Sequence, residues 1–100
     1  MKALIVIPTY NESGNIEPLI TQILATVPAI EVLVIDDASQ DGTGAIVDGL
    51  AARLPQVHVL HRAGKLGLGT AYLRGFDYAI ENGYELVFEM EGSPPSPSHP

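Results

Sequence analysis

Short apolar runs alternate along the chain with longer segments in which apolar residues recur at helical spacing. The apolar runs are residues 4–7, 32–35, 57–60 and 86–90, and each is a predicted β-strand. The first two runs are apolar on both faces, which is typical of strands buried in a parallel sheet.

Helices are predicted between these strands. Asn15 can cap the first, Asp41 can cap the second, and Gly83 can end the third, which covers residues 68–82. The order of strands and helices predicts an α/β fold: a Rossmann-like parallel sheet of about four strands with helices on both faces. Each helix buries a stripe of apolar residues: Ile16, Leu19, Ile20, Ile23, Leu24 and Val27 in the first, Ile46, Val47, Leu50 and Leu54 in the second, and Tyr72, Leu73, Phe76, Ala79 and Ile80 in the third.

The character of the chain changes after residue 91. Residues 92–100 hold four of the eight prolines and no large apolar side chain, so they cannot continue a buried strand. We therefore predict one folded unit over residues 1–91 and a disordered Pro/Ser-rich tail over residues 92–100.

Composition narrows the classes of protein to consider. With 100 residues the chain is one domain at most, and 46% hydrophobic and 17% charged residues are typical of a globular protein. The absence of cysteine excludes a disulfide scaffold, and a net charge of −7 argues against general nucleic-acid binding. No apolar run is long enough to span a bilayer. We expect a cytoplasmic protein, with or without peripheral attachment to a membrane.

An open parallel sheet binds its ligands beyond the carboxyl ends of its strands. Here those segments are residues 8–14, 36–43, 61–69 and the residues after Met90. Two phosphate-binding motifs are excluded there. The first strand is not followed by the G-x-G-x-x-G of dinucleotide sites, and Lys65 is not followed by Ser or Thr as in a P-loop.

Asp36 and Asp37 end the second predicted strand and are the strongest binding candidates. A carboxylate there can accept hydrogen bonds from two neighbouring ribose hydroxyls, and Asp37 suits this role if Asp36 turns back to orient the loop. Two adjacent like charges without compensation would destabilise the fold, which also favours a ligand contact for Asp37. Ser39 and Asp41 are interpreted instead as residues that shape the turn and cap the next helix.

Other polar residues near this edge have two interpretations each. Tyr10 could lie along a base and Glu12 could accept from its edge or from a sugar hydroxyl, or the two could be a surface tyrosine and a first-turn acid. Arg62 and Lys65 form a cationic loop that could meet phosphates or stay solvated. The histidines of the third strand lack a further ligand at metal-like spacing, so a zinc site is not expected.

Three stretches of the chain carry a family resemblance when they are taken together. They are residues 5–12 (IVIPTYNE), 34–43 (VIDDASQDGT) and 61–69 (HRAGKLGLG), followed by Ala71-Tyr72 and Gly75-Phe76. This set resembles the N-terminal part of family 2 glycosyltransferases, and their dolichyl- or polyprenyl-phosphate mannose synthases in particular. The resemblance covers about residues 3–91, and it implies the N-terminal half of a GT-A fold.

The resemblance also implies a nucleotide-sugar site. Enzymes of this kind transfer mannose from GDP-mannose to a polyprenyl (dolichyl) phosphate with inversion, and they hold Mg²⁺ or Mn²⁺ on an Asp-x-Asp motif. By this resemblance, Pro8, Tyr10 and Glu12 would frame the base and ribose. Ile35 and Asp37 would form the opposite wall, and Lys65 and Glu91 would complete the site.

The chain departs from the family pattern at the metal motif and beyond it. It has Glu91-Gly92-Ser93 in place of Asp-x-Asp, so Glu91 is expected to be only a weak metal ligand. The acceptor half has no counterpart, which implies a truncated chain that is weakly active or inactive alone. Its open sheet edge favours self-association.

Two alternatives stay open. The chain could be a non-catalytic module that binds a nucleotide or nucleotide sugar, or an α/β fragment without a ligand. A receiver-like signalling domain is disfavoured, because its phosphoacceptor Asp would end the third strand, where Leu60-His61 stands.

Overall fold

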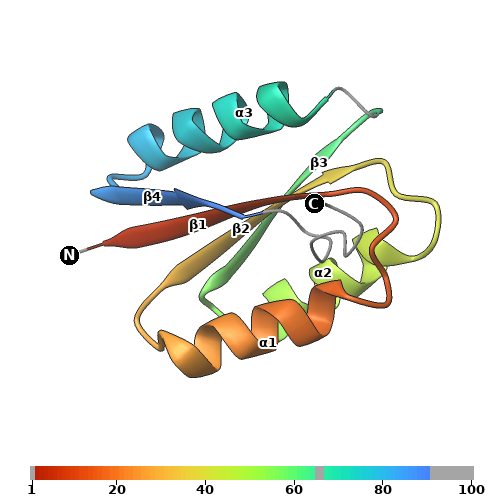
Figure 1. The fold of residues 1–100 in the computed structure, drawn as a ribbon, viewed down its shortest axis with the longest axis horizontal. Helices are drawn as coiled ribbons and strands as arrows, with labels where there is room; N and C mark the ends of the chain where they lie inside the picture. Colours follow the sequence, from red (N-terminus) through yellow and green to blue (C-terminus); the bar gives the residue numbers. More distant parts are fainter. Residues whose placement is uncertain (1, 65–66, 91–100) are drawn as a thin grey trace, which may run out of the picture.

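The computed structural model describes residues 2–64 and 67–90, which form one parallel sheet flanked by helices. The strands lie in the order β3-β2-β1-β4, with α1 and α2 on one face and α3 on the other (Figure 1). The predicted α/β fold with helices on both faces is therefore confirmed. In chain order the elements are β1 (Ala3–Thr9), α1 (Ile16–Thr26), β2 (Glu31–Asp37), α2 (Thr43–Arg53), β3 (Val57–Arg62), α3 (Leu68–Glu81) and β4 (Leu86–Glu89).

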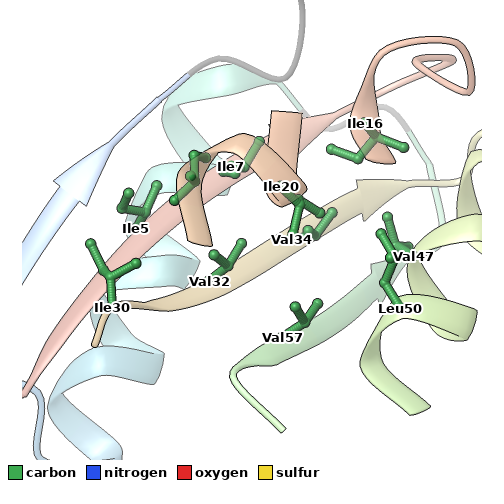
Figure 2. Packing of buried hydrophobic residues seen from close by; sticks show 11 residues of the cluster. Ile5, Ile7, Ile16, Ile20, Ile30, Val32, Val34, Val47, Leu50 and Val57 are labelled. Atoms are coloured by element: carbon green, nitrogen blue, oxygen red, sulfur yellow. The ribbon is translucent and has the colours of Figure 1, made fainter. Parts of the chain in front are cut away.

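The face covered by α1 and α2 is packed with branched aliphatic side chains. Alternate residues of β1 and β2 point to this face, and Ile16 and Ile20 of α1 are completely buried against them (Figure 2). From α2, Val47 and Leu50 extend the same core. The stripe predicted for α1 faces the core except at Val27, which follows the helix and is 45% exposed.

The face covered by α3 is packed differently, because small residues carry the contact. Ala71 and Ala79 are buried against Leu4, Val6, Leu33 and Ile35. Between them, a Cβ on Gly75 would lie only 2.5 Å from Val6 Cγ1. The backbone of α3 therefore comes close to the central strand at a point where no other residue fits without displacement.

The stripe predicted for α3 is partly wrong. Leu73 is 64% exposed and Ile80 is 78% exposed, so neither belongs to the core. Tyr72 packs against the core while remaining partly accessible, and Ala79 is buried as predicted. The buried face is rotated towards the small residues, because their size allows the helix to approach the sheet.

The element ends differ in detail from the predictions. Asn15 precedes α1, but its side chain makes no cap; its amide donates to the Glu12 carboxylate instead (3.3 Å). Gly42 stands at the cap position of α2, and Asp41 accepts the backbone N–H of Thr43 (3.1 Å) from one residue further back. Gly83 follows α3 with φ 74° and ends the helix as predicted. The predicted tail over residues 92–100 lies outside the described residues.

Candidate functional site at the carboxyl edge of the sheet

The carboxyl ends of β2 and β3 bring two acids opposite two bases. The parallel register pairs Asp36 with His61 and Asp37 with Arg62. Consecutive strand residues point to opposite faces, so Asp36 lies on the side of α1 and α2, whereas Asp37 lies on the side of α3. Both acids are buried: Asp36 is 3% exposed and Asp37 is 6% exposed. Each acid therefore has its own cation on its own face.

Asp37 forms a two-point ion pair with Arg62. The guanidinium donates from Nε to Oδ1 (2.6 Å) and from a terminal nitrogen to Oδ2 (2.8 Å). The other donors of Arg62 reach Thr70 Oγ1 (3.0 Å) and the Gly67 carbonyl (3.2 Å) at the start of α3. The expectation that the adjacent acids lack compensation is therefore wrong, and Arg62 is engaged within the protein rather than free to meet a phosphate.

Asp36 belongs to a separate chain of polar contacts. Its carboxylate accepts a hydrogen bond from Ser39 Oγ and lies 3.3 Å from His61 Nδ1, while His61 Nε2 lies 2.7 Å from the Asp48 carboxylate. The hydrogen bond with Asp48, helped by Asp36, outweighs burial and raises the pKa of His61. Two carboxylates suit a doubly protonated imidazole, which donates from both nitrogens.

The loops after β1 and β2 are joined to each other by hydrogen bonds. The Asn11 N–H donates to Ser39 Oγ (3.0 Å), and the Gln40 N–H donates back to Asn11 Oδ1 (2.8 Å). The Ser13 N–H donates to Asp41 (3.0 Å), and hydrogen bonds from Thr43 and Ser13 lower the pKa of Asp41 far below its usual value. These contacts give the carboxyl edge a fixed rim.

Backbone strain is concentrated in the same two loops. Asn11 and Ala38 have φ angles of 53° and 54°, in the left-handed region that residues with a side chain rarely adopt. Strain of this kind persists where the surroundings hold it in place, and it is frequent at binding sites.

Three of the residues implied by the family resemblance share one place in the fold. Pro8 and Ile35 are register partners on β1 and β2, and Asp37 lies two residues beyond Ile35 on the same side of the sheet, towards α3. Tyr10 follows β1 and is partly buried. The Glu12 N–H donates to Thr43 Oγ1 (2.9 Å), which ties the segment between β1 and α1 to the first turn of α2.

Two further implied residues, Lys65 and Glu91, lie outside the described residues. Among the residues that are described, no group of three or more His, Asp or Glu side chains could hold a metal ion. Within that same part of the chain, no helix is long and apolar enough to cross a membrane.

The sequence did not predict the pairing of Arg62 with Asp37 or the buried hydroxyl of Thr9. Arg62 is the partner of Asp37, and the only available signal was that both residues end neighbouring strands of similar length. Thr9 stands beside Asp36 in the register, and its buried hydroxyl has no hydrogen-bond partner among residues 2–64 and 67–90. A buried hydroxyl normally has a partner, which can be a water molecule or a ligand.

Open α/β sheets form a broad class of folds whose ligands bind beyond the carboxyl ends of the strands, where this chain has two buried carboxylates. Within that class, residues 4–86 match the family described as glycosyl transferase family 2. The chain belongs to this family.

Two mannosyltransferases of known sequence match this chain over nine-tenths of its length. The chain is 46% identical over 91 residues to the polyprenol monophosphomannose synthase of Mycolicibacterium smegmatis, covering 90% of this chain and 34% of that protein. It is 48% identical over 91 residues to the undecaprenyl-phosphate mannosyltransferase of Micrococcus luteus, covering 91% and 37%. It spans about a third of the length of these relatives.

A solved structure gives the same fold. The mannosyltransferase PcManGT from Pyrobaculum calidifontis, in complex with GDP-Man and Mn²⁺, superposes with a TM-score of 0.70 at 28% identity, covering 78% of this chain and 24% of that one. The sheet described above is thus the N-terminal part of the GT-A glycosyltransferase fold.

Proposed function

We propose that this chain forms the nucleotide-sugar-binding part of a mannosyltransferase, which takes GDP-mannose and, in a complete enzyme, transfers mannose to a polyprenyl phosphate. The observation that carries the proposal is the buried, doubly held carboxylate of Asp37 at the carboxyl edge. Relatives that share nearly half of its residues are named for transfer of mannose to such lipid phosphates.

The proposed ligand lies at the carboxyl edge on the side of α3. Pro8 and Ile35 offer an apolar floor there, and Asp37 offers acceptors for two neighbouring hydroxyls of a ribose. Tyr10 and Glu12 follow β1 at the same edge, and we assign them to the base and ribose. Lys65 and Glu91, which lie outside the described residues, are assigned to the same nucleotide-sugar site by the family resemblance, Glu91 also as a weak metal ligand.

The proposed chemistry depends on position more than on a strong base. The acceptor phosphate is already an anion, so transfer requires that the donor be held in line and that the departing diphosphate be neutralised. Mg²⁺ or Mn²⁺ would supply that neutralisation when bound. The described residues offer no set of ligands for such an ion, so we assign no step to it.

Calorimetric titration of the chain with GDP tests the nucleotide site directly. We expect binding by the unaltered chain and a loss of about tenfold or more in Asp37→Asn, since two hydrogen bonds to a charged acceptor are weakened. Asp77→Asn is the matched control, because Asp77 is exposed on the outer side of α3. Equal affinities in the unaltered chain and Asp37→Asn would overturn the assignment of Asp37.

The same titration with GDP-mannose and Mn²⁺ separates two functions. Tighter binding in the presence of Mn²⁺ supports a transferase part that recruits the metal. Binding that is unaffected by Mn²⁺ supports the second candidate, a non-catalytic nucleotide module, which the Glu91-Gly92-Ser93 sequence favours. No binding of either ligand at millimolar concentration would overturn both.

We also propose that the chain self-associates through β4. On its outer side β4 pairs with no strand among the described residues, and its Leu86 and Phe88 are 43% and 50% exposed. An apolar groove of about 350 Å³ beside it is lined by Ile5, Ile23 and Met90, among others. A second copy would pair edge to edge and cover this surface. Sedimentation velocity should detect a dimer that Phe88→Lys abolishes, whereas a monomer at every concentration would exclude it.

A peripheral membrane position belongs to the same proposal, because polyprenyl phosphates reside in membranes. Flotation with vesicles that contain polyprenyl phosphate tests it, with vesicles lacking that lipid as the control. Flotation with neither vesicle would exclude membrane attachment by this part of the chain.

A further inference from the structure

Among the described arginines, Arg62 is the one that is nearly buried and uses most of its N–H groups in contacts inside the protein. Its side chain is 12% exposed, against 65% for Arg53 and 41% for Arg74 in their surface ion pairs. It lies on β3, one strand away from the residues assigned to the ligand. Its role therefore needs an explanation other than direct contact with phosphate.

The contacts of Arg62 fix its guanidinium from two sides. On one side it grips both oxygens of Asp37, and on the other it donates to Thr70 Oγ1 and the Gly67 carbonyl at the start of α3. These bonds use four of the five N–H groups that a guanidinium carries. A guanidinium held in this way is a fixed support rather than a mobile counter-ion.

Fixing the guanidinium also fixes the plane of the Asp37 carboxylate. The terminal torsion of an aspartate is broad, so an unpaired carboxylate on a strand end would rotate. A carboxylate has about four lone-pair sites, and the two bonds from Arg62 leave the others with a defined direction. That arrangement suits two neighbouring hydroxyls, whose acceptors must be set at a fixed spacing before the ligand arrives.

We infer that Arg62 is a positioning residue for nucleotide binding, which acts by holding the Asp37 carboxylate in the orientation that a ribose diol requires. This inference rests on the proposed function. It predicts that Arg62 contributes to affinity through Asp37 and through nothing else. The energetic effects of changing the two residues should therefore not add.

GDP titrations of single and double variants test this prediction. Arg62→Lys keeps the charge but loses the two-point geometry, and we expect GDP binding to weaken about tenfold. Arg62→Met should weaken it further. In an Asp37→Asn background, Arg62→Lys should change the affinity by less than about twofold, because the residue it orients is already lost.

Arg53→Met is the matched control, since Arg53 forms an exposed ion pair with Glu17 on the opposite side of the sheet. It should bind GDP as the unaltered chain does. Circular dichroism identifies any variant that fails to fold, and Arg62→Lys decides the matter if Arg62→Met unfolds. A purely structural Arg62 would lower the melting temperature of Arg62→Lys and leave the affinity of the folded protein unchanged.

The outcomes distinguish this inference from the function on which it rests. If the unaltered chain binds GDP and folded Arg62→Lys binds it equally well, the positioning role is wrong and the proposed function stands. Additive losses in the double variant would also overturn the role, because they would require Arg62 to act independently of Asp37. If the unaltered chain does not bind GDP, the proposed function fails and the inference fails with it.

Discussion

On one face of the sheet two helices press branched aliphatic side chains onto β1 and β2, whereas on the other a single helix reaches β1 through alanine and glycine. The first face gains its stability from buried area, with residues such as Ile20 and Val34 completely enclosed. The second depends on close approach, with Gly75 against Val6. One sheet can thus be covered by two kinds of packing. Smaller side chains should destabilise the face of α1 and α2, whereas larger side chains should destabilise the face of α3.

The largest expected effect is on the face of α1 and α2. Ile20→Ala should lower the free energy of unfolding by about 2–5 kcal/mol, because it leaves a cavity in a rigid aliphatic core. Denaturant titration followed by circular dichroism measures it. The matched control is Ile80→Ala, the same change at a residue of α3 that is 78% exposed, which should stay within about 0.5 kcal/mol. A similar loss of unfolding free energy in both variants would contradict this expectation.

The next effect concerns the glycine contact on the other face. Gly75→Ala should destabilise the fold by about 1–3 kcal/mol, because the new methyl group would lie 2.5 Å from Val6 Cγ1 on the central strand. Gly49→Ala in α2 has nothing within 4 Å and should stabilise by up to about 1 kcal/mol through helix propensity. Thermal melts of the two variants should therefore shift in opposite directions, and a stabilised Gly75→Ala would show that α3 can move away.

The two faces should also differ in their response to acid. On the side of α3, burial alone would raise the pKa of Glu31, but hydrogen bonds from Tyr84 and His58 outweigh it and lower the pKa below its ordinary value of 4.5. The stability that this group contributes is present above pH 4.5 and is lost as the pH falls through the lowered pKa. Glu31→Gln should flatten the acid limb of a plot of melting temperature against pH, and an unchanged limb would contradict this.

The smallest effect is a loss of stability as the pH rises, and it is expected from His61 on the face of α2. The pKa of His61 is raised above 6.5 by Asp48 and Asp36. Its contribution is complete below pH 6.5 and is lost as the pH rises through the raised pKa. The side chain is 47% exposed, so solvent screening keeps the effect modest. His61→Gln should reduce the fall in melting temperature above pH 6.5, while Glu31→Gln should leave that limb unchanged.

Sequence patterns predicted the order of elements and the class of fold, because buried strands and amphipathic helices have different periods. The pattern failed on α3, where size rather than polarity marks the buried side: Leu73 points outward while Gly75 packs inward.

The candidate site was predicted as a list of residues but not as a network. The predicted runs 32–35 and 57–60 did not show how the two strands align, so the register that places Asp37 opposite Arg62 was not predicted. Long-range polar pairs depend on register, and register depends on how neighbouring strands align in three dimensions. The hydrogen bonds that join Asn11 with Ser39 and Gln40 also depend on how β1 and β2 align.

The pairing of β1 with β4 has a consequence for how the molecule assembles during translation. β1 is the first strand to be synthesised and lies between β2 and β4, yet β4 is the last strand of the described chain to emerge. Until then, the nascent chain exposes one hydrogen-bonding edge of a strongly apolar strand, a state prone to mispairing with other chains. The late closure of this long-range contact is expected to make folding slower than for a sheet whose neighbours follow one another in sequence.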